Sequence, residues 1–217
     1  MYDYLLFDLD GTLTDSKPGI INCLQYALEK LGKPEPDGEK LNCYVGPPLH
    51  KTFEKITGDP EKAMVAVGYY RERFATVGLF ENSVYEGIIP MLQKLKAAGK
   101  TLAVATSKPQ PYTDRILERY ELTEYFTVIV GSEMDGGRSD KAEVIAEAIK
   151  RLNIKEEDKD RILMIGDRQY DMIGAAKNGI ASMGVGYGYA EGDELEDAGA
   201  IYQIDTVDEL EKFLLQR

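Results

Sequence analysis

Two carboxylates directly follow the first apolar run of the chain. Residues 7–15 read FDLDGTLTD, so Asp8 and Asp10 come at the end of a strand predicted over residues 4–7. An Asp-x-Asp pair alone is compatible with an ordinary turn. The longer Asp-x-Asp-Gly-Thr pattern arises by chance in roughly one of 10³ chains of this length, at about 5% usage for each residue type. The pattern therefore favours a functional site at this strand end.

Hydroxyl side chains follow a second apolar run. Thr106 and Ser107 come directly after a strand predicted over residues 101–105. They could simply cap a helix predicted over residues 112–119. In a parallel sheet, however, they reach the same edge as Asp8, where a hydroxyl and a backbone N–H can hold a phosphoryl oxygen.

Lys141 stands at the start of another predicted helix. Asp140 and Glu143 have the spacing of a capping box, so we expect Asp140 as the N-cap of a helix over residues 141–152. A cation in the first turn opposes the helix macrodipole. The simplest interpretation is a solvated surface lysine; the functional one is a bound anion beside Lys141.

More carboxylates follow the strand predicted over residues 162–165. The chain continues GDRQYD, which places Asp167 at the strand end and Asp171 four residues later, where it could also cap a helix over residues 172–177. Two carboxylates 4 Å apart repel by about 4 kcal/mol at an effective dielectric of 20. A divalent cation would relieve this repulsion, and ligands that are all hard oxygens select Mg²⁺ over zinc.

These segments belong to a regular alternation of short apolar runs and helix-period stretches. The alternation predicts an α/β fold with a doubly wound, mostly parallel, Rossmann-like sheet. The expected strands cover residues 4–7, 101–105, 126–130, 162–165, 181–185 and 201–204. Such a sheet brings the strand-end carboxylates to one edge, where ligands bind.

The long stretch between the first two strands needs structure of its own. A helix start at Ser16-Lys-Pro18 leads to Gly32, and a second helix begins at Asp59-Pro60 and stops before Gly78. We therefore expect a core formed by residues 1–15 and 82–217, with a small helical module inserted over residues 16–81.

Composition narrows the classes of partner. The chain has 217 residues, 43% of them hydrophobic, and a formal net charge of −12, which disfavours nucleic acid polymers and anionic membranes. Cys23 and Cys43 are too few for a disulfide framework. No signal pattern or apolar run of about 20 residues occurs. We expect a cytoplasmic protein that binds small metabolites, with a monomer as the simplest oligomeric state.

The motifs, taken in order, resemble a known superfamily. DLDGT at residues 8–12, Thr106-Ser107, Lys141 and Gly166-Asp167-x-x-x-Asp171 are similar to the four motifs of the haloacid dehalogenase superfamily, specifically its phosphoglycolate-phosphatase-like members with a helical cap after the first motif. The resemblance covers essentially the whole chain. Four further segments resemble the branch described as 5′-nucleotidases. They are VGPPL at 45–49, ENSVY at 81–85, GSEMD at 131–135 and YGY at 187–189.

The resemblance implies specific roles for the carboxylates. Asp8 would be the nucleophile that forms an aspartyl phosphate, and Asp10 the general acid that then becomes the base. An Asp at position 10 is absent from the dehalogenases and phosphonatases of the superfamily. Mg²⁺ would be held by Asp8, the backbone carbonyl of Asp10 and Asp167, with Asp171 as a ligand through water or a partner of Lys141.

The resemblance also implies phosphate-binding residues. Thr106, with Ser107, and Lys141 would hold the transferring phosphoryl group. Many relatives have Lys-Pro at the third motif, whereas Ala142 follows Lys141 here, and Arg138 is close enough to compete for the role. The helix start at Asp140 favours Lys141.

The function implied is a Mg²⁺-dependent phosphomonoester hydrolase acting on a small phosphorylated metabolite, similar to 5′-nucleotidases or phosphoglycolate phosphatases. A phosphosugar mutase of the β-phosphoglucomutase kind, a pyrophosphatase and a non-catalytic signalling module that carries phosphate on Asp8 are the alternatives. An inserted cap favours turnover of small ligands over signalling. The inserted module over residues 16–81 would be the cap of the catalytic core and would select the substrate. Within it, we expect residues 45–50 to reach the leaving group. The sequence reveals no partner for the lone His50.

Overall fold

The computed structural model describes residues 2–47 and 49–216 and divides into two compact units. One unit runs from the N-terminus to Thr14 and from Val84 to the C-terminus, and the other spans Asp15–Ser83. The sequence placed these boundaries at 15/16 and 81/82, and the structure has them at 14/15 and 83/84.

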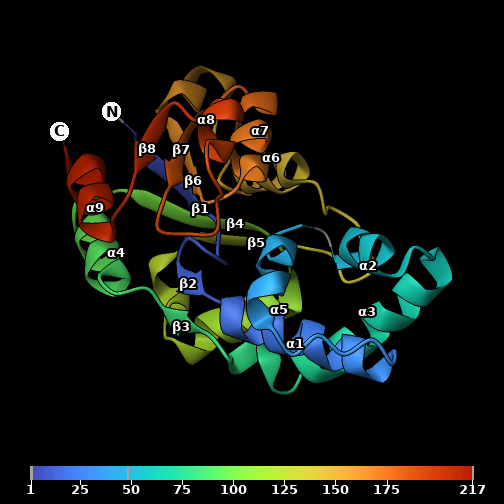
Figure 1. Ribbon diagram of the computed structural model, residues 1–217. Coiled ribbons are helices and arrows are strands. Elements are labelled where there is room, and N and C mark those ends of the chain that lie inside the picture. The colour runs from blue at the N-terminus through green and yellow to red at the C-terminus, as the bar shows by residue number, and fades with distance from the viewer. Residues whose placement is uncertain (1, 48, 217) are drawn as a thin grey trace. The chain divides into compact units, whose positions relative to one another are not determined.

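The larger unit is built on a parallel sheet (Figure 1). The six strands lie in the order β5-β4-β1-β6-β7-β8. Their bounds are β1 (Tyr4–Phe7), β4 (Thr101–Pro109), β5 (Val128–Ser132), β6 (Ile162–Gly166), β7 (Ala181–Val185) and β8 (Tyr202–Ile204). The predicted doubly wound α/β fold is confirmed. The order reverses at β1, and ligands of such sheets bind beyond the carboxyl ends of the strands at the reversal.

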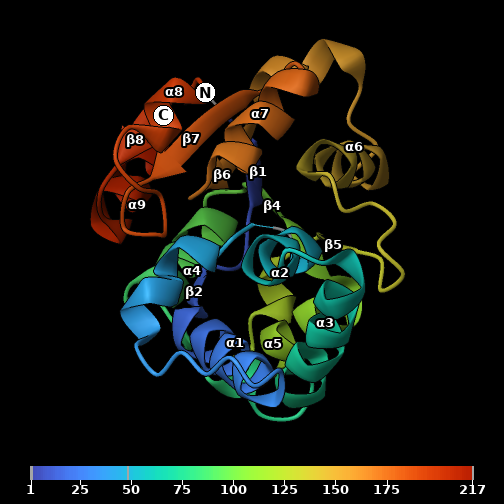
Figure 2. The same cartoon turned by 45° about the vertical axis from the view of Figure 1, so that its right-hand side comes forward.

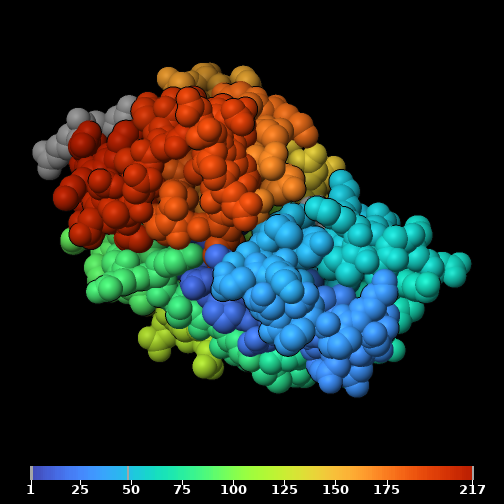
Figure 3. All heavy atoms as spheres, viewed as in Figure 1, coloured from blue at the N-terminus to red at the C-terminus, as the bar shows by residue number. Residues whose placement is uncertain are grey.

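Helices cover both faces of this sheet. They are α4 (Ile88–Ala97), α5 (Gln110–Arg119), α6 (Lys141–Arg151), α7 (Gln169–Lys177), α8 (Glu194–Asp197) and α9 (Val207–Leu215), with short 3₁₀ turns at Thr123–Tyr125 and Glu156–Arg161. Helices α6 and α7 pack side by side on one face, and α4 packs against α9 (Figures 1 and 2). In the space-filling view, the orange and red atoms from α7 onward form one continuous surface of this unit (Figure 3).

Burial on both faces explains why β1 forms at the centre. Leu5, Leu6 and Phe7 are each 0% exposed. A continuous apolar run of this kind is typical of a parallel strand covered by helices on each side. Leu6 belongs to the core cluster that contains Val144 and Ile145 of α6. The strand that ends just before Asp8 is therefore held within the buried core of the unit.

Three predicted boundaries near the polar segments are wrong. Strand β4 continues to Pro109 instead of ending at Ala105, with a register shift against β5 between these two residues. Helix α5 starts at Gln110 with Pro109 as N-cap, so Thr106 and Ser107 do not cap a helix. Helix α7 starts at Gln169, three residues earlier than predicted, which puts Asp171 inside its first turn.

The smaller unit is helical, as predicted. Its elements are α1 (Lys17–Lys30), a 3₁₀ helix at Gly38–Tyr44, α2 (Leu49–Thr57), α3 (Pro60–Phe74) and a 3₁₀ turn at Gly78–Phe80. Helices α1 and α2 both pack on α3. The predicted start at Asp59 is confirmed, because its side chain accepts hydrogen bonds from Glu61 N and Lys62 N. The short strands β2 (Thr14–Asp15) and β3 (Ser83–Val84) pair where the chain passes between the units.

Two sequence hypotheses concern this unit. The segment 45–50 includes Pro48, which lies outside the described residues, so its role as a contact for the leaving group stays a prediction. His50 is exposed near the start of α2. Within the described part of the chain, no helix combines the length and the apolar composition needed to cross a bilayer.

Candidate functional site

The site begins where β1 ends. The backbone N–H of Asp8 donates to Ile165 O of β6 at 2.9 Å, which extends the sheet ladder to the first carboxylate. The chain then turns at Gly11, whose φ is +81°. A Cβ at Gly11 would lie 2.0 Å from Asp167 Oδ2, so only glycine allows the loop after β1 to approach the end of β6.

Lys141, the first residue of α6, joins the carboxylates of two other elements. Its Nζ lies 2.9 Å from Asp8 Oδ1 and 2.7 Å from Asp171 Oδ1. It also donates to Ala105 O at 3.1 Å, so three acceptors surround an ammonium with three N–H groups. The side chain is 4% exposed. Burial opposes the charged form, but Asp171 and Asp8 outweigh it and raise the pKa of Lys141.

Asp167 is fully buried at the end of β6. Its Oδ2 accepts a hydrogen bond from Tyr189 N at 2.8 Å, and its Oδ1 accepts one from Thr12 Oγ1 at 3.3 Å. Burial and then the charges of Asp171 and Asp8 raise its pKa well above the usual 3.8. Two hydrogen bonds therefore hold this carboxylate in place, and Arg168 only partly offsets the effects that raise its pKa.

Asp171 faces the same point from the first turn of α7. Its Oδ2 accepts the backbone N–H of Arg168 at 3.1 Å, so it does stabilise a helix start, although from inside the helix. Burial raises its pKa to about 6; Lys141 lowers it and Asp8 raises it. A Cβ at Gly166 would lie 2.1 Å from Asp171 Cγ, which explains the glycine beside Asp167.

Together these groups form an acidic cluster, defined as Asp8, Asp167 and Asp171. Each offers a carboxylate oxygen within 4.8 Å of the others. At this separation two carboxylates repel by about 3 kcal/mol at an effective dielectric of ~20. Lys141 supplies one positive charge against three negative ones, so a divalent cation fits the charge, and the hard oxygens suit magnesium.

Asp10 follows Asp8 by two residues and pairs with a lysine other than Lys141. Its Oδ2 accepts from Lys108 Nζ, in an ion pair whose lysine side chain is 6% exposed. Thr106, 2% exposed, accepts the backbone N–H of Lys108 on its Oγ1 at 3.3 Å. Ser107 is exposed, and its carbonyl accepts from Ser132 Oγ at 2.8 Å.

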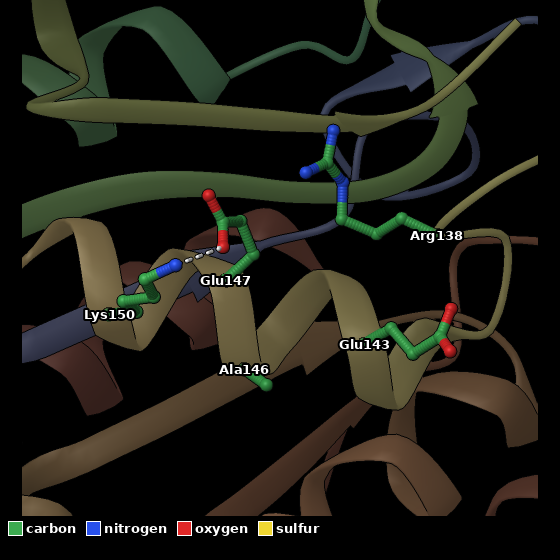
Figure 4. Close-up of a pocket in the computed structure, with 5 residues that line it drawn as sticks. All are labelled: Arg138, Glu143, Ala146, Glu147 and Lys150. Atoms are coloured by element: carbon green, nitrogen blue, oxygen red, sulfur yellow. Dashed lines mark ion pairs between the residues drawn. The ribbon is translucent and has the colours of Figure 1, made fainter.

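Arg138, the competitor of Lys141, is engaged elsewhere. Its Nε donates to Gly131 O at 3.1 Å, and its Nη2 lies 3.5 Å from Glu133. It lines a surface pocket along α6 with Glu143, Ala146, Glu147 and Lys150 (Figure 4). The preference for Lys141 at the carboxylates therefore agrees with the geometry. Asp140 caps α6 by accepting from Ala142 N at 2.9 Å.

Comparison with known proteins identifies the family. A family model described as haloacid dehalogenase-like hydrolase matches residues 5–185. The chain belongs to this family. A 5′-nucleotidase of Pseudomonas aeruginosa is 45% identical over 195 residues, which cover 89% of this chain and 87% of that protein. The tyrosine-protein kinase PtkA of Mycobacterium tuberculosis is 40% identical over 97% of this chain and 72% of its own length.

Solved structures agree with this assignment. The crystal structure of a "predicted phosphatase" from Clostridium acetobutylicum matches with a TM-score of 0.92 and 49% identity, covering 99% of both chains. The resemblance found in the motifs is thus confirmed. The prediction that the chain is an enzyme of a hydrolase family that includes phosphatases is confirmed as well.

Most of the residues that lie together at the site of this haloacid dehalogenase-like hydrolase were predicted from the sequence. Asp8, Lys141, Asp167 and Asp171 come together from β1, α6, β6 and α7. The alternative of Asp171 as a partner of Lys141 agrees with the ion pair. The side chain of Asp10 turns to Lys108, which leaves the expected use of its backbone carbonyl as a metal ligand a prediction.

Other groups at the site of this hydrolase were not predicted from the sequence. Lys108 was not predicted to belong to the site. Its i+2 spacing from Thr106 places both residues on one side of the extended strand β4. Tyr187 Oη donates to Thr12 O at 2.9 Å. A Cβ at Gly188 would lie 2.2 Å from Asp167 Cβ. The repeated glycines around Tyr187 were the available signal for such a close backbone approach.

Proposed function

We propose that this chain is a Mg²⁺-dependent phosphomonoesterase that works through a phosphate ester on Asp8. The observation that carries the proposal is the position of Lys141, within 2.9 Å of Asp8 and 2.7 Å of Asp171 at the edge of the sheet where ligands bind. Phosphoryl transfer needs a positioned nucleophile and a balance for negative charge more than elaborate covalent chemistry.

The first half-reaction transfers the phosphoryl group to the protein. An oxygen of Asp8 attacks phosphorus, and the bond between phosphorus and the leaving oxygen breaks with its electron pair on that oxygen. Asp10 donates a proton to the leaving oxygen, which departs as an alcohol. Lys141 lies close enough to Asp8 to contact a phosphoryl group attached there, and the buried hydroxyl of Thr106 is proposed as a second contact.

The second half-reaction releases phosphate. A water molecule attacks the phosphorus of the ester while the Asp10 carboxylate takes a proton from it. The bond between phosphorus and Asp8 breaks, which restores the free carboxylate. Asp8, Asp167 and the backbone carbonyl of Asp10 would hold Mg²⁺, with Asp171 beside it, and the bound ion would neutralise charge on the carboxylates and the phosphoryl oxygens.

The substrate is proposed to be a small phosphate monoester. The similarity to a 5′-nucleotidase favours nucleoside 5′-monophosphates, with phosphoglycolate as the second choice because relatives of that name are less similar, for example 27% identical in Vibrio parahaemolyticus. We propose that the helical unit Asp15–Ser83 selects the substrate. A cytoplasmic location remains our expectation.

A phosphate-release screen with and without a chelator tests this function. We expect free phosphate from at least one nucleoside 5′-monophosphate, a loss of about 10²-fold or more with EDTA, and recovery with Mg²⁺, because the cation is worth several kcal/mol of charge stabilisation. An isomerised sugar phosphate without free phosphate would instead indicate a mutase. A long-lived phosphoprotein, or phosphate transferred to protein tyrosine as the name of PtkA suggests, would also contradict the proposal.

Thermal unfolding tests the metal separately from turnover. In the metal-free folded protein, burial raises the pKa of Asp171 to about 6 and that of Asp167 well above 3.8. The folded state then binds protons more readily than the unfolded state, so metal-free stability falls as pH rises from about 4 through about 6. Because Mg²⁺ binds the ionised carboxylates, we expect it to raise Tm more at pH 7.5 than at pH 5.

The expected shift at pH 7.5 is about 5–10 °C when Mg²⁺ is present at roughly 100 times its Kd. Asp167→Asn should lose most of this shift. The control Asp3→Asn changes an aspartate at the other end of β1, which pairs with Arg161. This variant should keep the full Mg²⁺-induced shift in Tm. An equal shift at both pH values, or an undiminished one in Asp167→Asn, would contradict a metal at the acidic cluster.

A further inference from the structure

A second buried lysine pairs with Asp10 and has no assigned task. Lys108 Nζ donates to Asp10 Oδ2, and the lysine side chain is 6% exposed. Lysine is rarely buried to this degree without a charged partner, because removing an ammonium from water is costly. The pairing with Asp10 is therefore a specific feature of the fold.

The backbone around Lys108 is built to hold it there. The register of β4 against β5 shifts between Ala105 and Pro109, and such irregularities re-aim side chains. The N–H of Lys108 donates to Thr106 Oγ1 at 3.3 Å, and its carbonyl accepts from Thr113 Oγ1 at 3.3 Å. On the neighbouring strand, a Cβ at Gly131 would lie 2.6 Å from Lys108 O. Strand β5 thus approaches this backbone closely.

The two oxygens of Asp10 are in different situations. Oδ2 is bound to Lys108, whereas Oδ1 is buried and accepts no hydrogen bond from any described residue. A buried oxygen without a donor is costly unless it has another use. With one oxygen tied to Lys108, the other is the atom that can exchange a proton.

We propose that Lys108 is a positioning residue that orients Asp10 so that its Oδ1 serves the leaving group. The inference rests on the proposed function and extends it. In the first half-reaction the proton passes from Asp10 Oδ1 to the leaving oxygen, which keeps the electron pair of the broken bond to phosphorus. Lys108 neither gives nor takes a proton, and its ion pair fixes the side chain of Asp10.

The two buried lysines then have separate tasks. Lys141 is bound to Asp8 and Asp171, which belong to the acidic cluster. Lys108 is bound to Asp10. Removing Lys141 acts on the nucleophile and the metal ligands, whereas removing Lys108 acts on protonation of the leaving group. A series of leaving groups separates these effects.

The test uses Lys108→Met with phenyl, 4-nitrophenyl and 2,4-dinitrophenyl phosphate. The value of kcat/KM reports the steps up to loss of the phenol. Phenyl phosphate has a poor leaving group that needs a proton, so we expect its kcat/KM to fall about 10²-fold or more, the usual contribution of general acid catalysis. 2,4-Dinitrophenol leaves without protonation, so its ester should lose less than about threefold, with 4-nitrophenyl phosphate between the two.

Two matched variants complete the design. Lys108→Arg keeps the cation and should recover much of the activity on phenyl phosphate. Lys100→Met removes another lysine at the opposite end of the sheet, whose side chain is 8% exposed and lies 3.8 Å from Asp3. This variant should hydrolyse all three esters as the wild type does. An equal loss on all esters in Lys108→Met would assign Lys108 a merely structural role, and no loss would also overturn the proposal.

Crystal structures of the variants give a readout that does not depend on turnover. We expect Asp10 to keep its orientation in Lys100→Met and to adopt a different one in Lys108→Met; an unchanged Asp10 would overturn the inference. Failure of the proposed function is recognised separately. In that case the wild-type protein with Mg²⁺ would hydrolyse none of the esters, whatever the orientation of Asp10.

Discussion

Replacing Asp8 with asparagine is expected to reduce hydrolysis of 4-nitrophenyl phosphate by on the order of 10⁴-fold or more, because an amide cannot form the phosphate ester. The fold should persist with a stability equal to or above that of the wild type. Asp8 raises the pKa of both Asp167 and Asp171, so it destabilises their charged forms. Asparagine keeps an oxygen that can accept from Lys141 while removing one negative charge from the acidic cluster.

The measurement combines turnover with metal-free thermal unfolding at pH 7.5. We expect Asp8→Asn to lose activity and to have a Tm equal to or above that of the wild type. Asp3→Asn is the matched control, since Asp3 stands at the other end of the same strand and pairs with Arg161. Most activity retained in Asp8→Asn would exclude Asp8 as the nucleophile. Loss of both activity and stability would show that the carboxylate is needed for folding.

Strands with continuous apolar runs could be predicted from the sequence. The bounds of β1 and β7 agree with the expected ones, because their apolar side chains are buried and their ends are marked by polar residues or glycine. Asp8 and Asp167 follow directly from such strand ends. These two positions need only the rule that parallel strands present their carboxyl ends at one edge.

The course of β4 could not be predicted in the same way. The residues after Ala105 are polar and end in a proline, which is typical of a turn. In the fold, Pro109 still pairs with Ser132 of β5 after the register shift, so a partner distant in sequence keeps the chain extended. The pairing with β5 outweighs the local preference for a turn. The position of Lys108 beside Asp10 therefore could not be predicted from the sequence.

Contacts made through the backbone were equally hidden. Tyr189 N donates to Asp167, although 22 residues separate them in sequence. No pattern of side-chain types marks a backbone N–H as a ligand. The run of alternating glycine and tyrosine at residues 186–189 indicates only that the chain passes close to something. What it passes close to is decided by the packing of β6 against β7.

Replacing Lys141 with methionine is expected to have the largest effect on stability. The variant leaves Asp8, Asp167 and Asp171 within 4.8 Å of one another with no ammonium between them. Removing one partner of a buried ion pair costs about 3–5 kcal/mol, and the expected loss in the free energy of unfolding of the metal-free protein at pH 7 lies in this range. Activity should fall as well, because the phosphoryl group loses its cation.

The pH dependence shows whether this loss is electrostatic. Lys141 lowers the pKa of Asp171, so its removal raises that pKa further above the unfolded value of 3.8. A carboxyl whose folded pKa is raised gains stability for the folded state as pH falls toward 4. Urea unfolding without metal should therefore show a smaller deficit at pH 5 than at pH 7, and at pH 7 added Mg²⁺ should recover part of it.

The control separates charge from packing. Lys100→Met removes a lysine of similar burial that donates to Tyr2 O at 2.7 Å and pairs with one aspartate, so it should cost only about 1 kcal/mol. Methionine nearly matches the length of lysine, so little volume is lost in either variant. A deficit in Lys141→Met that is the same at pH 5 and pH 7 would mean that packing around α6, rather than charge at the acidic cluster, is what Lys141 supplies.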